Sequence, residues 1–168
     1  MTRLTERQLN RATLARQLLL ERVRLPAVEA VRRIVALQAQ EAASPYLALW
    51  NRVERFDPAE LDRAFVEQTV VKATLMRITL HAVHVCDYPL LHSAMQPTLR
   101  AARLGDRRFR ATGLSSADAD ALIPEVSAFA ARPRSNAEVE AWLDERLGPT
   151  PKPGVWWALR QYGPFVHA

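Results

Sequence analysis

The sequence predicts a mainly α-helical fold with small β-hairpins, that is, a protein of the α+β class. Three observations lead to this prediction. Apolar residues recur at helical spacing over most of the 168 residues, and helix-capping signals precede many of these stripes. One stretch between residues 70 and 85 is instead rich in β-branched residues, which favour strands.

The first part of the chain predicts four helices. Thr5 followed by Gln8 has the pattern of a capping box, and Pro26 suits the first turn of a second helix. The dipeptides Ser44-Pro45 and Asp57-Pro58 open a third and a fourth helix. The apolar stripes of these helices comprise Leu14, Ala15, Leu18, Leu19, Ala27, Val28, Val31, Ile34, Val35, Tyr46, Leu49, Trp50, Val53, Leu61, Ala64 and Phe65.

The period of the pattern changes at residue 70. Residues 70–76 and 78–85 hold no glycine or proline and predict the two strands of a hairpin that turns at residues 76–78. Asp87 can cap a further helix that ends near Gly105. Two helices joined by a short turn and followed at once by a hairpin have the order of a winged helix-turn-helix unit.

The helical pattern restarts after residue 113. Ser115 or Ser116 caps one helix, and Ser135 with Glu138 forms a capping box for the next. A connection rich in proline and glycine precedes a short helix, and the final segment, Phe-Val-His-Ala, predicts the first half of a strand. This order repeats that of the first half, but it stops before a hairpin.

The element order therefore predicts two tandem winged helix-turn-helix units, the second truncated. Residues 1–112 would form the first unit with extra flanking helices, and residues 113–168 a partial second unit. The chain is long enough for one large domain or two small ones.

Composition favours nucleic acid as a partner. The formal net charge is +5, and the 23 basic residues are arginines except for Lys72 and Lys152. Arginine binds phosphate through a bidentate guanidinium, although a GC-rich gene would give the same bias. No apolar run can span a bilayer, the first residues lack a signal peptide, and a single cysteine excludes an internal disulfide. These features predict a cytoplasmic, nucleoid-associated protein without a membrane partner.

The segment Leu-Gln-Ala-Gln at residues 37–40 holds two amides separated by one residue. Gln38 continues the apolar stripe of the second helix, and Gln40 lies two residues further on. Positions two apart on a helix do not share a face, so both amides can meet one object only if the helix ends here. One interpretation is a satisfied helix C-terminus. The other is a paired site that holds a water molecule or a base edge through hydrogen bonds.

Several short motifs together resemble one known family. At this spacing they are similar to the bacterial winged-helix DNA-binding family, which includes DNA glycosylases that excise N-alkylated purines or unhook interstrand crosslinks. The motifs are Ala36-Leu37-Gln38-Ala39-Gln40, Ser44-Pro45, Leu49-Trp50-Asn51-Arg52, Phe56-Asp57-Pro58 and Met76-Arg77-Ile78-Thr79-Leu80-His81. The resemblance covers residues 5–90 well and the rest loosely. Members have glycine where this chain has Ile78, and they are longer, with further winged helices and a β-barrel-like region.

The resemblance implies a catalytic role for Gln38 and Gln40, which would position the water that attacks the sugar carbon. An N7-alkylated purine carries positive charge, which already weakens its glycosidic bond. The enzyme must then mainly orient the nucleophile and stabilise a cationic sugar. The implied partner is double-stranded DNA, alkylated or crosslinked, and the hairpin residues Arg77, Thr79 and His81 would contact it.

A basic patch follows the hairpin. The first three of its arginines share a helical face if the helix continues through Gly105, which favours contact with phosphate; the alternative is a solvated charged surface. By contrast, the helix that begins at Pro58 is acidic, so we expect phosphates to repel it and its role to be structural. The arginines of the patch are Arg100, Arg103, Arg107, Arg108 and Arg110.

The sequence thus predicts a winged-helix DNA-binding protein related to these DNA glycosylases, with DNA N-glycosylase activity as the enzymatic hypothesis. The alternative is a non-catalytic winged-helix DNA-binding module or transcriptional regulator, and a third hypothesis is a winged helix that binds protein. No cofactor or metal is expected, because His81 and His84 point to opposite faces of a strand. Trp156 and Trp157 are expected in the core. The oligomeric state is left open.

Overall fold

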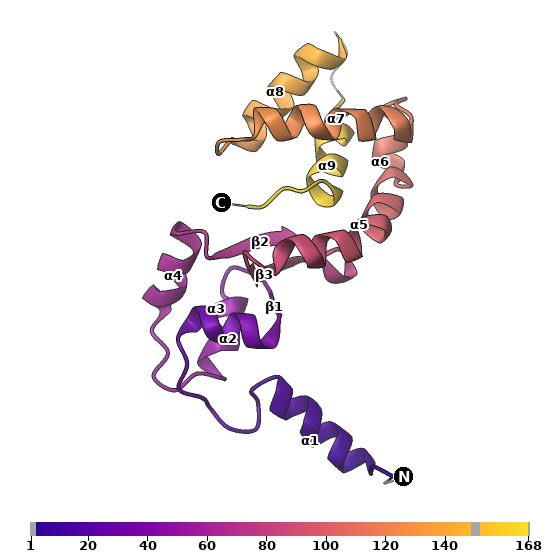
Figure 1. Cartoon of the computed structure of the whole chain (residues 1–168). Coiled ribbons are helices and arrows are strands. Elements are labelled where there is room, and N and C mark those ends of the chain that lie inside the picture. The colour runs from indigo at the N-terminus through magenta and orange to yellow at the C-terminus, as the bar shows by residue number, and fades with distance from the viewer. Residues whose placement is uncertain (1–2, 149–151, 168) are drawn as a thin grey trace. The chain divides into compact units, whose positions relative to one another are not determined.

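The computed structural model of the chain describes residues 3–148 and 152–167 (Figure 1). Contacts group these residues into two compact units. Unit 1 comprises the described residues up to Leu90 together with His167, and unit 2 comprises those from Leu91 to Val166. The helix α5, Tyr88–Leu104, begins in unit 1 and continues in unit 2. That the chain divides after residue 112 into two winged-helix units stays a prediction.

Unit 1 contains helices and one small sheet, which confirms the α+β class (Figure 1). The predicted capping box of Thr5 and Gln8 is present, and the predicted hairpin turns at the short 3-10 segment η1. The elements in chain order are α1 Glu6–Arg16, α2 Ala27–Ile34, β1 Ala36–Gln38, α3 Ser44–Trp50, α4 Pro58–Val66, β2 Val70–Thr74, η1 Met76–Ile78 and β3 Leu80–His84.

The three strands form an antiparallel sheet in the order β1-β3-β2. In the pairing of β1 with β3, Leu37 lies opposite Ala82 and Gln38 opposite His81. Leu37, Ala82 and Val70 lie on one face of the sheet, and all three belong to the hydrophobic core of unit 1. Helices α2, α3 and α4 contribute most of the other core residues, among them Ala30, Val31, Ile34, Leu49, Leu61 and Ala64.

The junction of α2 and β1 corrects the sequence analysis. The second helix ends at Ile34, so the prediction that Gln38 continues a helical stripe is wrong. Val35 joins helix to strand with φ 75° and ψ −52°, and its N–H donates to the Arg32 carbonyl at 3.2 Å. The reason is tertiary: pairing with β3 gives the backbone of residues 36–38 ladder partners, and this outweighs the local helical pattern.

The acidic helix α4 packs Leu61, Ala64 and Phe65 against the core, as predicted. Leu61 is completely buried. The Glu60 carboxylate accepts a hydrogen bond from the Ala27 N–H at 3.0 Å, so it caps the first residue of α2. Asp62 accepts from the Tyr46 hydroxyl at 2.5 Å, and this hydrogen bond raises the pKa of Tyr46 to about 12. The acids of this helix therefore hold α2 and α3 in place.

The segment that follows α1 anchors that helix, all of whose residues are exposed. Leu18 is buried in the core of unit 1. Arg52, from the motif Leu49–Arg52, donates through Nε to the Gln17 carbonyl and through Nη1 to the Ala48 carbonyl, both at 2.8 Å. Burial lowers the pKa of Arg52. The connection between α1 and α2 is thus tied to α3.

Unit 2 consists of helices in the part of the chain that the structure describes. Ser115, rather than Ser116, caps α7, and Ser135 with Glu138 forms the predicted capping box of α8. Trp156 is buried, as predicted, and its Nε1 donates to Asn136 Oδ1 at 2.9 Å. None of the described helices of the chain is long and apolar enough to cross a membrane. Besides the end of α5, the helices are α6 Arg107–Arg110, α7 Ser116–Phe129, α8 Asn136–Leu147 and α9 Pro153–Tyr162.

The end of α5 lies near Gly105, as predicted, and decides whether the arginines of the patch share a helical face. The helix ends at Leu104 and does not continue through Gly105. Asp106 takes up an extended conformation, and its carboxylate accepts from the Arg108 N–H at 2.8 Å, which starts the short helix α6. The arginines before and after Gly105 therefore do not share one helical face.

The predicted final strand comprises residues 165–168, of which Ala168 lies outside the described residues. His167 forms one antiparallel bridge with Lys72, and its N–H donates to the Lys72 carbonyl at 2.7 Å. The segment thus pairs with β2 over a single residue pair.

Candidate nucleic-acid interface

Gln38 ends β1, and Gln40 lies two residues further on, just beyond the strand. Leu37 and Ala39 are buried, with 4% and 5% exposure, whereas the two glutamines between and after them are exposed. This alternation is that of a strand, in which residues two apart share a face. The two amides could therefore bind the same molecule because of strand-like alternation, and not because a helix ends here.

The sheet holds Gln40 in place. The backbone ladder continues one residue beyond β1, because the Ala39 N–H donates to the Leu80 carbonyl at 2.8 Å. The Leu80 N–H in turn donates to Gln40 Oε1 at 3.3 Å. The carbonyl of this amide is thus engaged by the start of β3, and its NH₂ group is left as a donor.

His81 lies opposite Gln38 in the ladder and opposite Ala73 on the other side. It is only 5% exposed, and its Nδ1 lies 2.9 Å from the Thr79 carbonyl oxygen. Since a carbonyl only accepts, Nδ1 is the donor of this hydrogen bond. This burial leaves little of His81 for direct contact with DNA, so the predicted contact stays a prediction.

The hairpin tip has unusual backbone geometry. Arg77 and Ile78 have φ of 54° and 60°, and the Thr79 N–H donates to the Met76 carbonyl at 3.2 Å, the pattern of a type I′ turn. Arg77 is exposed, and the Thr79 hydroxyl donates to the Met76 carbonyl at 3.1 Å. Ile78, which stands where members of the similar family have glycine, thus has a positive φ. A β-branched residue adopts it at a cost of about 1–2 kcal/mol.

Arg100 is engaged inside unit 2. Its Nε lies 2.9 and 3.1 Å from the two carboxylate oxygens of Asp120, and its Nη2 lies 2.5 Å from one of them. The guanidinium holds the pKa of Asp120 below its usual range. Asp120 also accepts from the Tyr162 hydroxyl at 3.4 Å. This arginine links α5 to α7 and α9.

Arg103 and Arg108 stack on Trp157. Their guanidinium carbons lie 4.8 and 4.9 Å from the centroid of the indole ring, within the range of cation–π interactions. Burial lowers the pKa of Arg103, and its Nε has no hydrogen-bond partner in the part of the chain that the structure describes. Arg107, Arg108 and Arg110 are all classed as exposed residues.

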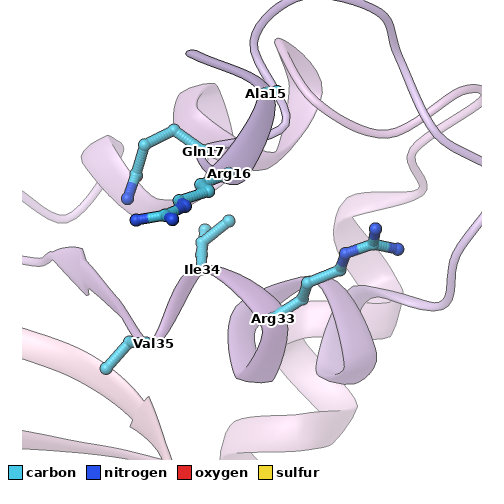
Figure 2. Close-up of a pocket in the computed structure, with 6 residues that line it drawn as sticks. All are labelled: Ala15, Arg16, Gln17, Arg33, Ile34 and Val35. Atoms are coloured by element: carbon cyan, nitrogen blue, oxygen red, sulfur yellow. The ribbon is translucent and has the colours of Figure 1, made fainter. Parts of the chain in front are cut away.

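A cleft of about 510 Å³ lies where α1 and α2 end, and the sequence analysis did not predict it (Figure 2). In Figure 2 the side chains of Arg16 and Gln17 extend to one side from the end of α1, and that of Arg33 extends to the opposite side from α2, with Ile34 between them. The signal that would have indicated it is an arginine in the last turn of each of two successive helices. The lining residues are Ala15, Arg16, Gln17, Arg33, Ile34 and Val35.

The fold and the surface define an arginine-rich, mainly helical protein with a paired-amide site on a small sheet. Residues 31–168 match the family model described as DNA glycosylase AlkZ-like, and the chain therefore belongs to this family. This match confirms the resemblance seen in the motifs between Ala36 and His81, and it includes both glutamines and the arginine patch.

A solved structure of similar fold is the DNA glycosylase AlkZ of Streptomyces sahachiroi, with a TM-score of 0.82 and 21% sequence identity. The alignment covers 99% of this chain and 47% of that chain, so this chain spans about half the length of that protein. None of the curated proteins compared matches the chain.

Proposed function

We propose that the chain acts as a DNA-repair N-glycosylase on double-stranded DNA, excising N-alkylated purines or unhooking interstrand crosslinks. The observation that carries the proposal is that Gln38, at the end of β1, and Gln40, two residues further on, are both exposed while Leu37 and Ala39 are buried. Membership of the AlkZ-like DNA glycosylase family supports it.

In the proposed reaction the two amides orient one water molecule. The water oxygen forms a bond to C1′ of the sugar as the bond from C1′ to the purine N9 breaks. The cationic alkylpurine takes up that electron pair and leaves as a neutral base, and the proton of the water passes to solvent. Because the leaving group is already charged, orientation and stabilisation of the cationic sugar supply most of the catalysis. The hydrogen bond from Leu80 to Gln40 Oε1 keeps one amide oriented beforehand.

We assign DNA contact to the hairpin tip through Arg77 and Thr79, and to the exposed arginines Arg107, Arg108 and Arg110. Helices α2–α4 with the hairpin would act as a winged helix-turn-helix unit in which the hairpin, rather than α4, meets DNA. The acids of α4 already cap α2 and hold Tyr46, which supports this choice. A cytoplasmic, nucleoid-associated location follows from such a role.

A non-catalytic DNA-binding module is the second candidate. The observation that favours it is that both residues of the site are neutral amides, and an amide cannot act as a general base at neutral pH. In that case the same face would bind a base edge and release nothing.

The test uses the full chain and a duplex that contains N7-methylguanine. Gln38→Ala and Gln40→Ala should each lower the rate of base release about 100-fold, the size of effect seen when one positioned hydrogen-bonding group is lost. Glu41→Ala, an exposed neighbour, serves as the matched control and should keep the wild-type rate. Wild-type rates in both glutamine variants would exclude the catalytic assignment. Tight binding without base release by the wild type would favour the non-catalytic module.

A further inference from the structure

The cleft at the ends of α1 and α2 is lined in part by residues that come directly before β1, the strand that ends at Gln38. Ile34 and Val35 line it, and β1 with Gln38 begins at the next residue. The cleft belongs wholly to unit 1, as do both glutamines. Whatever binds there is therefore held close to the start of β1, which carries Gln38 and leads to Gln40.

The lining of the cleft is basic. Arg16 and Arg33 line it together with the amide of Gln17, and no carboxylate does (Figure 2). Neither arginine side chain makes an ion pair or a hydrogen bond with any residue that the structure describes. Arg100 differs from these two arginines, because its guanidinium forms an ion pair with the Asp120 carboxylate.

The helix ends do not neutralise this charge. Both arginines sit in the last turn of a helix, where the backbone carries a partial charge of about −0.5 at each C-terminus. Two guanidinium groups against two helix ends leave a net charge of about +1 at the cleft. In addition, several terminal carbonyls already accept from backbone N–H groups, as Arg32 does from Val35. The cleft thus attracts anions.

The wall of the cleft contains the strained residue Val35. Its φ of 75° and ψ of −52° are those of a tight turn that β-branched residues rarely adopt, and the side chain is 49% exposed. Backbone strain of this kind persists where the surrounding structure imposes it and gathers at functional sites. Here it lies at the junction of α2 and β1, three residues before Gln38.

We propose that this cleft binds a phosphodiester of the DNA backbone and so fixes the position of the duplex relative to Gln38 and Gln40. The planar donor pair of an arginine matches two phosphate oxygens, and Gln17 adds an amide donor. This inference rests on the proposed function, because it takes DNA as the ligand. It makes Arg16 and Arg33 positioning residues rather than catalytic ones.

The test compares two double variants of the full chain in duplex binding. Arg16→Gln with Arg33→Gln removes both charges from the cleft, and Arg7→Gln with Arg32→Gln removes two exposed charges from the same helices outside it. Each lost phosphate contact lowers the slope of log K against log salt by about 0.9 for duplex DNA. The cleft variant should therefore lose about one unit of slope, and the control variant should keep the wild-type slope.

Phosphate ethylation interference then locates the contact. With wild type and control, ethylation of one particular phosphate should block binding, and with the cleft variant this signal should vanish. Equal slopes in the two variants, or unchanged interference in the cleft variant, would overturn the proposal. A titration with inorganic phosphate, monitored through the NMR signals of the arginine Nε–H groups, tests whether the cleft binds only small anions. If these signals respond to phosphate but not to the duplex, the proposal is also overturned. Base release by wild type is measured in parallel, so that failure of this inference and failure of the glycosylase proposal are separate results.

Discussion

The glutamine pair of unit 1 and the arginine patch of unit 2 were equal candidates for contact with DNA, and the fold treats them differently. Gln38 and Gln40 are exposed, and the ladder between β1 and β3 holds the backbone beneath them. Of the five arginines in the patch, Arg100 pairs with Asp120, while Arg103 and Arg108 stack on one indole ring. A side chain that the fold already engages, as it engages Arg100, has fewer donors left for a binding partner.

The contrast follows from the two kinds of side chain. Arginine has a long apolar stem and a flat cation, so it packs along aromatic rings and reaches carboxylates on other helices. In the helical unit 2, Trp157 and Asp120 offer such partners. Glutamine on a strand is shorter and is directed by the alternation of the backbone, which turns it outward wherever its neighbours are buried.

Loss of Trp157 should have the largest effect on this comparison. Trp157→Ala removes the ring on which Arg103 and Arg108 stack, and we expect the free energy of unfolding to fall by about 2 kcal/mol. Trp50→Ala is the control, because that ring is 54% exposed and stacks with a single arginine, Arg22. It should cost less than about 1 kcal/mol. Urea denaturation measures both; equal losses would mean that the stack adds nothing to the stability of unit 2.

Replacing the hairpin tip should separate stability from DNA binding. The double variant Arg77→Asn with Ile78→Gly introduces the residues that a type I′ turn prefers, and we expect a gain of about 1 kcal/mol in stability. The same variant should bind duplex DNA more weakly, since the exposed Arg77 is gone. Thermal unfolding and duplex titration give the two results. A less stable variant would show that the positive φ angles of the tip carry no strain.

The ion pair of Arg100 and Asp120 should give the smallest effect. The pair is 34% and 44% exposed, so Asp120→Asn should cost at most about 1 kcal/mol at neutral pH. Because Arg100 lowers the pKa of Asp120, the contribution is fully present above the unfolded value of 3.8 and is lost as the pH falls through the folded pKa. Denaturation of both proteins between pH 7 and pH 2 checks this. If the difference in the free energy of unfolding between wild type and Asp120→Asn does not decrease at low pH, the effect comes from packing and not from the ion pair.

Local signals in the sequence predicted much of the fold. The capping residues Thr5, Asp57, Ser115 and Ser135 all begin helices where expected, because a cap is a contact between residues two or three apart. The hairpin was predicted from β-branched composition for the same reason. The wrong prediction, that Gln38 continues the apolar stripe of the second helix, concerns a place where a helical pattern continued but the chain did not follow it.

The sequence by itself determined the helices, the hairpin, the family and the two glutamines of the candidate site, since each depends on neighbours along the chain or on a motif at fixed spacing. Only the tertiary structure decided that Gln38 lies on a strand and Gln40 just beyond it, because β1 exists through its pairing with β3, more than forty residues away. It also decided which arginines have internal partners and that Arg16 and Arg33 line one cleft. Contacts between residues distant in the chain depend on how the core packs, and helical periodicity carries no information about them.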